Sequence, residues 1–523
     1  MAMRPSRRAC LRALAAGAAG YAVPGGLGAL PSPTVDLCAT GPVFAQALAA
    51  GRTDFGGERL RVDAGAPLAM RARSVGDRLA FEASAGERRL LRPTLVVDTG
   101  TRVQVDLAND LTEPTVAHWH GLAVDTRNDG NGEALIAPGA RFAYDFTVRN
   151  RAGLYWYHPH PHGATAEQVY RGLFGLLEVQ DDEDAALRRA LALTPGDTEL
   201  ALVVQDRPGG DVRRYAPGPA DAMLGWYGCV PEVNGVVRPF QEVAARRYRL
   251  RVLNGANART YRLAFRRANG TALPFHLIGT DGGLLARALP CREVLVSPAE
   301  RVDLLVDFAG LPRGESVVLA SRAFDPMQAV RPPPAPPDPA HAAMATGAVP
   351  DGAAFDLMQF RVRESGRAGP PLPDRLSQVP DVATPADDAR PLRLGFAKGQ
   401  WRINDRVYDA TATPIEVARG ARETWLLRNY HASAPHAMHL HGFHFRVLER
   451  ETSPDTLAPL AVDDRGRLAT DLGWKDTVLV WPGESVRVAI DFASPFPDAQ
   501  IYLVHCHNLE HEDAGMMLRV RVG

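Results

Sequence analysis

Short apolar runs separated by turn residues recur along most of the chain. Runs such as "TLVVDTG", "RVQVDLAND", "FAYDFTVRN", "LALVVQD" and "SVVLASR" are rich in valine and leucine and are bounded by Gly, Asn, Asp or Arg. Runs of this length and spacing are typical of the strands of β-sandwiches. Helical periodicity is scarce, apart from an acidic stretch over 181–193 that predicts one short helix. The pattern therefore predicts an all-β protein.

Two pairs of segments repeat weakly between the two ends of the chain. "EPTVAHWHGLAV" resembles "SAPHAMHLHGFHF", and "GLYWYHPHPHG" resembles "YLVHCHNLEHEDAGMM". This repetition predicts two related sandwich domains, over 55–185 and 391–523, with a third domain over 195–325 between them. Because His276 is the only histidine of the middle section, we expect that domain to hold no metal.

The segment 326–390 breaks the strand pattern. It contains "RPPPAPPDPA" and "GPPLPDRLSQVP", and such proline-rich sequence favours extended backbone. The sequence therefore predicts a connector between the second and third domains.

The N-terminal segment has a basic start followed by a short Ala- and Leu-rich run. Arg7, Arg8 and Leu11 resemble a twin-arginine export signal, with Cys10 in place of the usual bulky residue. A general secretory signal is the alternative. "AQA" at 45–47 predicts a leader over 1–47, although other small-residue sites compete with it. We therefore expect a periplasmic or secreted protein, without a membrane span because the apolar run is too short.

Chain length, net charge and cysteine content limit the number of domains and the kinds of partner that we expect. At 523 residues the chain exceeds the size of one hydrophobic core, so several domains are expected. A formal net charge of -1 gives no basic excess for nucleic acid, and we expect a monomer that binds small molecules. Cys229 and Cys291 lie outside the leader, and their spacing is compatible with a disulfide or with two free thiols.

Histidines gather in four clusters, each containing an H-x-H pair. The clusters are "HWHG" (His118, His120), "HPH" (His158, His160), "HAMHLHG" (His436, His439, His441) and "HCHNLEHEDAGM" (His505, Cys506, His507, His511, Met516). Residues two apart on a strand share a face, so each pair directs two imidazoles to one place. Cys506 points the other way. A thiolate with two imidazoles and a weak axial methionine is the ligand set of a blue-copper centre.

These four motifs, in this order, resemble those of three-domain multicopper oxidases of the laccase and bacterial copper-efflux-oxidase kind. The resemblance covers the chain from about residue 60 to its end, with Ala437 where many members have proline. It implies three cupredoxin-like Greek-key β-sandwich domains and four copper ions. It also implies the ligands: His118 and His439 for type 2 copper; His120, His158 and His507 for one type 3 copper; His160, His441 and His505 for the other; and His436, Cys506, His511 and Met516 for type 1 copper.

The same resemblance implies that single electrons from a small reducing substrate reduce O2 to water. Asp129 and Glu512 match acids that serve proton transfer in the family. Phenols and aromatic amines are the expected donors, because the methionine-rich insert usual in copper-efflux oxidases is missing. Oxidation of cuprous ion is the alternative, and a copper-free structural relative is an alternative of another class.

Overall fold

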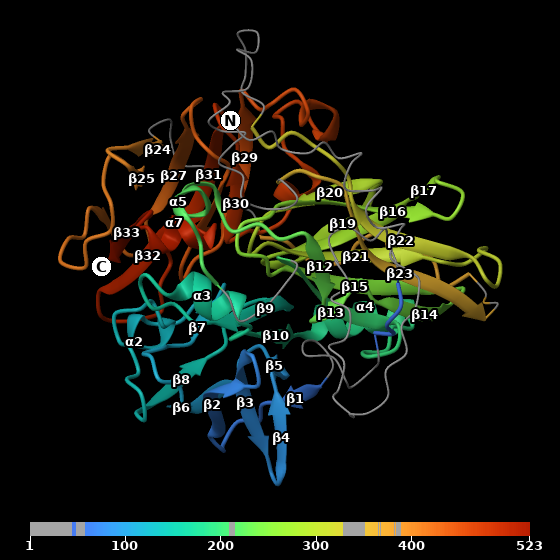
Figure 1. The fold of residues 1–523 in the computed structure, drawn as a ribbon, viewed down its shortest axis with the longest axis horizontal. Helices are drawn as coiled ribbons and strands as arrows, with labels where there is room; N and C mark the ends of the chain where they lie inside the picture. Colours follow the sequence, from blue (N-terminus) through green and yellow to red (C-terminus); the bar gives the residue numbers. More distant parts are fainter. Residues whose placement is uncertain are drawn as a thin grey trace, which may run out of the picture. The chain divides into compact units, whose positions relative to one another are not determined.

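The structure is a computed structural model that describes residues 44–48, 58–208, 215–327 and 351–523, the last range without 365, 367, 381 and 383–388. Strands dominate it, and they form six sheets (Figure 1). The all-β prediction is confirmed. Among the described residues, none of the helices has the length and apolar character needed to cross a membrane.

The first sandwich pairs two five-stranded sheets, in the orders β1-β5-β10-β9-β7 and β4-β3-β2-β6-β8. Side chains from both sheets, such as Phe81, Val105 and Leu177, form its core. Its strands are β1 (Arg59–Arg61), β2 (Leu68–Val75), β3 (Arg78–Ala85), β4 (Arg88–Leu91), β5 (Thr94–Asp98), β6 (Arg102–Asn109), β7 (His118–His120), β8 (Arg141–Thr147), β9 (Gly153–His158) and β10 (Gly175–Gln180). It also carries the helices α2 (Thr126–Asp129) and α3 (Thr165–Tyr170).

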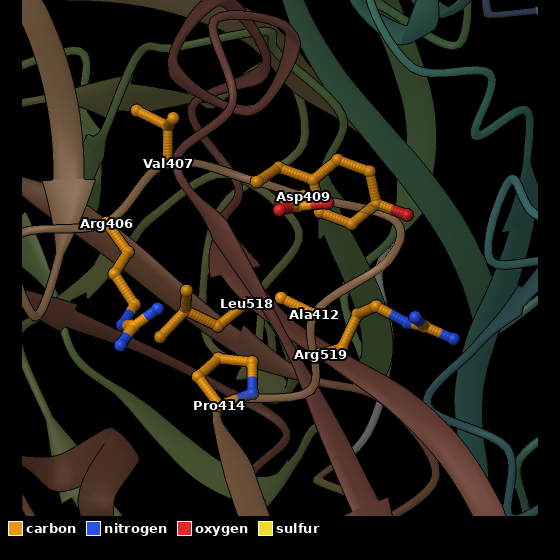
Figure 2. Close-up of a pocket in the computed structure, with 8 residues that line it drawn as sticks. Arg406, Val407, Asp409, Ala412, Pro414, Leu518 and Arg519 are labelled. Carbon is orange, nitrogen blue, oxygen red and sulfur yellow. The ribbon is translucent and has the colours of Figure 1, made fainter.

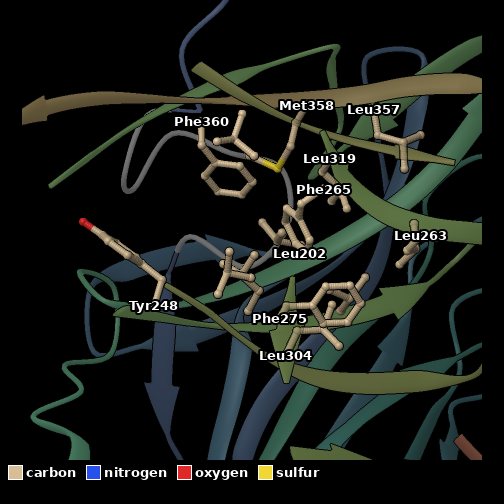
Figure 3. Close-up of a cluster of buried hydrophobic side chains, with 14 of the residues drawn as sticks. Leu202, Tyr248, Leu263, Phe265, Phe275, Leu304, Leu319, Leu357, Met358 and Phe360 are labelled. Carbon is tan, nitrogen blue, oxygen red and sulfur yellow. The ribbon is translucent and has the colours of Figure 1, made fainter. Parts of the chain in front are cut away.

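The second sandwich follows the helix α4 (Asp182–Leu191), which confirms the acidic helix expected from the sequence. It pairs a seven-stranded and a six-stranded sheet around the core that contains Leu202, Phe265, Leu304 and Phe360 (Figure 3). Its elements are β11 (Glu199–Arg207), α5 (Pro219–Leu224), β12 (Val230–Val233), β13 (Val236–Val237), β14 (Phe240–Ala244), β15 (Arg247–Asn254), β16 (Tyr261–Arg267), β17 (Ala272–Leu273), β18 (Phe275–Thr280), β19 (Gly283–Cys291), β20 (Glu293–Val296), β21 (Arg301–Asp307), β22 (Ser316–Ser321) and β23 (Phe355–Glu364).

The strand β23 corrects the predicted connector over 326–390. It lies between β14 and β22 in the six-stranded sheet, and it buries Leu357, Met358 and Phe360 in the core of the second sandwich. The sequence pattern did not predict this strand, because proline-rich stretches flank it on both sides. The second sandwich therefore extends to Glu364, beyond the expected boundary at 325.

The third sandwich pairs two five-stranded sheets, in the orders β25-β24-β27-β31-β29 and β26-β33-β32-β28-β30. Trp425, Val488, Val504 and Val520 contribute to its core from both sheets. Its elements are β24 (Arg390–Ala397), β25 (Gln400–Ile403), β26 (Ile415–Val417), β27 (Arg422–Asn429), β28 (His436–Leu440), β29 (Phe445–Glu451), η1 (Ala458–Leu460), η2 (Ala469–Leu472), β30 (Thr477–Val480), β31 (Ser485–Asp491), β32 (Gln500–Cys506), α7 (Leu509–Asp513) and β33 (Met517–Val522).

Residues 44–48, at the end of the expected leader, lie against the second sandwich. Ala47 forms a β-bridge with Phe240, and Arg361 donates a hydrogen bond to the carbonyl oxygen of Phe44. Leu48 is buried in the core of that sandwich. A leader that ended at 47 would remove the bridge and the hydrogen bond. The rest of the expected leader lies outside the described residues.

Cys229 and Cys291 are not paired with each other. Cys229 is in a disulfide, whereas Cys291 is a free thiol, as is Cys506. Both expectations from the sequence are therefore wrong: the two residues form no mutual disulfide, and they are not two free thiols. The partner of Cys229 lies outside the described residues.

Candidate metal centres

Eight histidines meet between the first and third sandwiches, and all of them are buried. His118 and His120 lie on β7, directly beside β9, where His118 pairs with His158. The arrangement repeats in the third sandwich, where His439 on β28 pairs with His505 on β32. The period-two prediction from the sequence is confirmed, because each H-x-H pair places both of its imidazoles in the same cluster. This cluster, called the eight-histidine centre below, comprises His118, His120, His158, His160, His439, His441, His505 and His507.

Hydrogen bonds orient most of these imidazoles by one ring nitrogen. His118 Nδ1 lies 2.6 Å from the Asp129 carbonyl oxygen, His439 Nδ1 lies 2.9 Å from the Asp476 carbonyl oxygen, and His158 Nδ1 lies 2.8 Å from that of Pro159. Since a carbonyl accepts only, each Nδ1 carries the proton, which leaves Nε2 with a free lone pair.

The free nitrogens face one another. His441 Nε2 lies 3.0 Å and His160 Nε2 3.4 Å from His505 Nε2, and His120 Nδ1 lies 3.3 Å from His158 Nε2. Buried Nε2 atoms of His118, His439 and His507 have no hydrogen-bond partner. Buried polar atoms are rarely left unpaired, so lone pairs converging in this way fit a site for metal ions.

Burial keeps several of these imidazoles neutral, which is the form that binds metal. It lowers the pKa of His120, His158, His160, His439 and His441 well below the ordinary value and that of His507 to about 3, with neighbouring imidazoles adding to the effect. Among the described residues, three triads of histidines have ligand atoms within 4.8 Å of one another: His118, His120, His158; His118, His439, His441; and His160, His441, His505.

A second centre lies inside the third sandwich. His436 Nδ1 and His511 Nδ1 are 3.5 and 3.6 Å from Cys506 Sγ, and they are 3.2 Å from each other. All three residues are buried, and burial raises the pKa of the Cys506 thiol to about 12. Met516 is buried in the same core cluster, and its carbonyl oxygen accepts a hydrogen bond from Cys506 N. This cysteine centre matches the donor set expected for a thiolate-bound copper.

The two centres are joined through three consecutive residues. Cys506 belongs to the core of the third sandwich, whereas His505 and His507 belong to the eight-histidine centre. Alternation along the end of β32 causes this division. One backbone segment therefore connects the cysteine sulfur to imidazoles of the other centre.

Both predicted acids reach the eight-histidine centre. Asp129 Oδ2 lies 2.8 Å from His441 Nδ1, and burial raises the pKa of its carboxyl group. Glu512 Oε1 lies 3.4 Å from His160 Nε2, and its Oε2 lies 3.2 Å from His505 Nδ1. Burial opposes ionisation of Glu512, but these two imidazoles outweigh it and hold the pKa of the carboxyl group well below its ordinary value.

Asp129 is held in place by a close approach of two backbones. It ends the short helix α2, and Gly130 follows with a φ of 69°. A Cβ atom at Gly130 would lie 2.1 Å from the carbonyl oxygen of Ala117, just before β7. Only glycine therefore lets the Asp129 turn lie directly against His118.

The structure adds an acid that the sequence analysis missed. Asp476 Oδ1 lies 3.2 Å from His120 Nε2, and the Asp476 carbonyl oxygen holds His439. Arg301, from β21 of the second sandwich, donates to both carboxylate oxygens, at 2.8 and 2.6 Å. Burial disfavours the charge on Asp476, but Arg301 and His120 outweigh it and hold the pKa of its carboxyl group well below the ordinary value. The middle sandwich thus holds an acid that orients two imidazoles.

The helix α7 contacts all three sandwiches through acidic side chains. The Glu510 carboxylate accepts hydrogen bonds from Asn257 Nδ2 and Trp226 N of the second sandwich. Asp513 accepts from the backbone N–H groups of Thr165 and Ala166 at the start of α3. Glu512, between them, contacts the imidazoles. The position of His511 is therefore fixed by the docking of the three sandwiches.

A pocket of about 390 Å³ lies between the segment 406–414 and the strand β33 (Figure 2). It is lined by Arg406, Val407, Tyr408, Asp409, Ala412, Pro414, Leu518 and Arg519. The Tyr408 ring packs on His162 with 4.2 Å between centroids, and the His162 ring lies 6.0 Å from that of His160. Two side chains therefore separate the pocket from a histidine of the centre.

The fold and the two centres define a copper-dependent oxidoreductase built from cupredoxin-like domains. Residues 79–184 and 377–523 each match a family model described as multicopper oxidase. A laccase of Bacillus subtilis is 30% identical over 77% of this chain and 78% of its own length. A multicopper oxidase of Staphylococcus haemolyticus is 28% identical over 83% and 82%. The crystal structure of the McoA multicopper oxidase from Aquifex aeolicus superposes with a TM-score of 0.79 at 31% identity, covering 91% of this chain and 99% of that one.

The chain therefore belongs to the multicopper oxidase family, and copper is the metal that this family implies. The orientation of the imidazoles and the Cys506 donor set fit copper ions at both centres.

Proposed function

We propose that this protein is a laccase-like oxidase that takes single electrons from phenols or aromatic amines and delivers them to O2, which is reduced to water. The observation that carries the proposal is the segment His505–Cys506–His507, which joins the cysteine centre to the eight-histidine centre. Copper bound at both centres would supply one-electron uptake at the first and reduction of O2 at the second.

The proposed ligands follow the two centres. His436, Cys506, His511 and Met516 would hold type 1 copper; His118 and His439 would hold type 2 copper; His120, His158 and His507 would hold one type 3 copper, and His160, His441 and His505 would hold the other. The triads His436, Cys506, His511 and His160, His441, His505 support two of these four sets directly.

Asp129 and Glu512 are proposed to supply protons, because reduction of O2 to water consumes four. Asp129 keeps His441 oriented through Nδ1, and its raised pKa favours a carboxyl group that holds a proton. Glu512 bridges His160 and His505. The side chains of Tyr408 and His162 lie between the pocket and His160.

Aromatic donors are proposed because the Bacillus subtilis relative is a laccase and because the Trp401 ring packs against both imidazoles of the cysteine centre. Oxidation of cuprous ion is the second candidate, from the family resemblance. A copper-free structural role is not favoured, because every proposed ligand side chain is present and buried.

We also propose export by the twin-arginine route and a monomeric state. The ligands come from the first and third sandwiches, and the second sandwich holds α7 through Glu510, so the metal sites form only in the folded chain. A route that carries folded proteins fits this requirement.

The test is copper content, blue absorption and O2 uptake of the purified protein with a phenol, an aromatic diamine and cuprous ion. Cys506→Ser is the matched control, because it should abolish the blue absorption while the eight-histidine centre keeps its ligands. A wild-type protein without copper and without blue colour would refute the oxidase. Oxidation of cuprous ion alone would refute only the aromatic donors.

A further inference from the structure

Neither imidazole of the cysteine centre is exposed to solvent. His436 and His511 are both buried, and their outer nitrogens are occupied within the protein. His436 Nε2 lies 3.1 Å from Ser433 Oγ, and His511 Nε2 lies 2.9 Å from the carbonyl oxygen of Met223 on α5. An organic donor therefore cannot touch either ring without displacing protein.

One aromatic side chain contacts both imidazoles. The Trp401 ring on β25 lies 4.8 Å from that of His436 and 4.7 Å from that of His511, measured between centroids. Its Nε1–H donates to the same Met223 carbonyl oxygen, at 2.8 Å, which fixes the indole. Trp401 is only 4% exposed, so it is an internal neighbour of the centre.

The contact series continues to the surface at Phe396. Phe396 on β24 is the cross-strand partner of Trp401, and their rings are 4.8 Å apart at 66°. Unlike Trp401, Phe396 is 40% exposed, which is unusual for a large apolar side chain of this protein. Aromatic rings attract one another edge-to-face or offset at 4.5–7 Å, so an exposed ring of this kind presents a stacking surface to a planar ligand.

We propose that a planar aromatic donor docks on Phe396 and that Trp401 carries its electron to His436 and His511. In this step a phenol loses one electron and its hydroxyl proton: the O–H bond breaks, the proton goes to solvent water, and a phenoxyl radical leaves. The electron would pass through the indole to oxidised copper, which His436, Cys506 and His511 would hold and which would be reduced by that electron. This inference rests on the proposed function, since it assigns the docking surface for the proposed class of donor.

Three variants separate docking from electron transfer. Phe396→Ala removes the stacking surface; Trp401→Phe keeps a ring between Phe396 and the imidazoles but removes the indole. Tyr430→Ala is the control: Tyr430 is 45% exposed, and its ring lies over Gly395, which points to the opposite face of β24 from Phe396. Two measurements are made: the Kd of 4-nitrophenol, a phenol that resists oxidation, with copper-free protein, and the rate at which the blue absorption bleaches anaerobically with an oxidisable phenol or with hexaammineruthenium(II).

We expect Phe396→Ala to weaken 4-nitrophenol binding about 2- to 10-fold and to slow bleaching by the phenol but not by the ruthenium complex. Trp401→Phe should leave the Kd unchanged and slow bleaching by both reductants, with the type 1 potential and spectrum unaltered. Tyr430→Ala should change nothing.

An unchanged Kd in Phe396→Ala, or equal slowing with both reductants, overturns the docking surface. Unchanged bleaching in Trp401→Phe, or slowing accounted for by a shifted potential, overturns the relay. Both failures leave phenol oxidation by the wild type intact, whereas failure of the proposed function would remove phenol oxidation from the wild type itself.

Discussion

The buried pair Arg301–Asp476 gives the sharpest prediction of the structure. Asp476 accepts two hydrogen bonds from Arg301, one from Thr477 Oγ1 at 2.9 Å, and contacts His120 Nε2 at 3.2 Å. Both partners are almost fully buried. Asp476→Asn keeps the shape of the side chain but removes the charge that favours the Nε2–H tautomer of His120. We therefore expect its Nδ1 to be a poorer copper ligand.

The pair affects two quantities: Asp476 orients a metal-binding histidine and so affects copper affinity, and its ion pair with Arg301 affects folding stability. Loss of a partner that orients a metal-binding histidine costs about 10- to 100-fold in metal affinity, or about 1.4–2.7 kcal/mol. Arg301→Leu leaves the Asp476 charge buried without its cation, which costs about 3–5 kcal/mol of folding stability. The double variant Arg301→Leu with Asp476→Asn should regain part of that stability, because no uncompensated charge remains.

Two assays separate these effects. Copper affinity is measured by competition with a chelator, and stability by urea unfolding of copper-free protein. Asp471→Asn is a matched control, since the Asp471 carboxylate also accepts two hydrogen bonds from a buried arginine, Arg450, at 2.6 and 3.0 Å, and its third donor is the backbone N–H of Leu468. We expect the control to lower stability alone. Wild-type copper affinity in Asp476→Asn, or an equal loss of affinity in the control, would refute the orienting role of Asp476.

Three further predictions concern proton supply by Glu512, the pH dependence of stability and the start of the mature chain. Glu512→Gln should slow O2 uptake while anaerobic bleaching of the blue absorption stays normal, and unchanged turnover would contradict a proton role. Copper-free protein should lose stability as the pH falls from about 6.5 towards 3, because unfolded histidines take up protons while the folded-state pKa of His507 and of His511 is about 3; a urea midpoint independent of pH would oppose this. The mature protein should begin before Phe44, and intact mass measurement of the exported chain would show a start at Leu48 if this is wrong.

The sequence predicted those parts of the site that depend on local spacing. Alternation along a strand was enough to assign Cys506 and its two neighbouring histidines to different centres, and the structure confirms it. Four repeats of the H-x-H pattern were enough to predict one shared cluster. Both inferences need only the geometry of a strand.

Contacts between distant segments could not be predicted in this way. Asp476 lies in "GWKDTVLV", which has no metal-ligand spacing, and its partner Arg301 comes from another sandwich. Met223 belongs to a short helix whose carbonyl oxygen meets His511 only after folding. The strand β23 was missed for a related reason. Its place between β14 and β22 depends on contacts with distant strands, whereas the local sequence shows only the prolines that flank it.

The helix α7 links the geometry of the two centres to the packing of the three sandwiches against one another. Three carboxylates within four residues act in three directions: Glu510 accepts from the second sandwich, Glu512 contacts imidazoles, and Asp513 accepts from α3 of the first. His511 lies between them and supplies a nitrogen to the cysteine centre. A displaced first or second sandwich would therefore shift a ligand that belongs to the third. The geometry of the cysteine centre thus depends on residues of domains that supply none of its ligands.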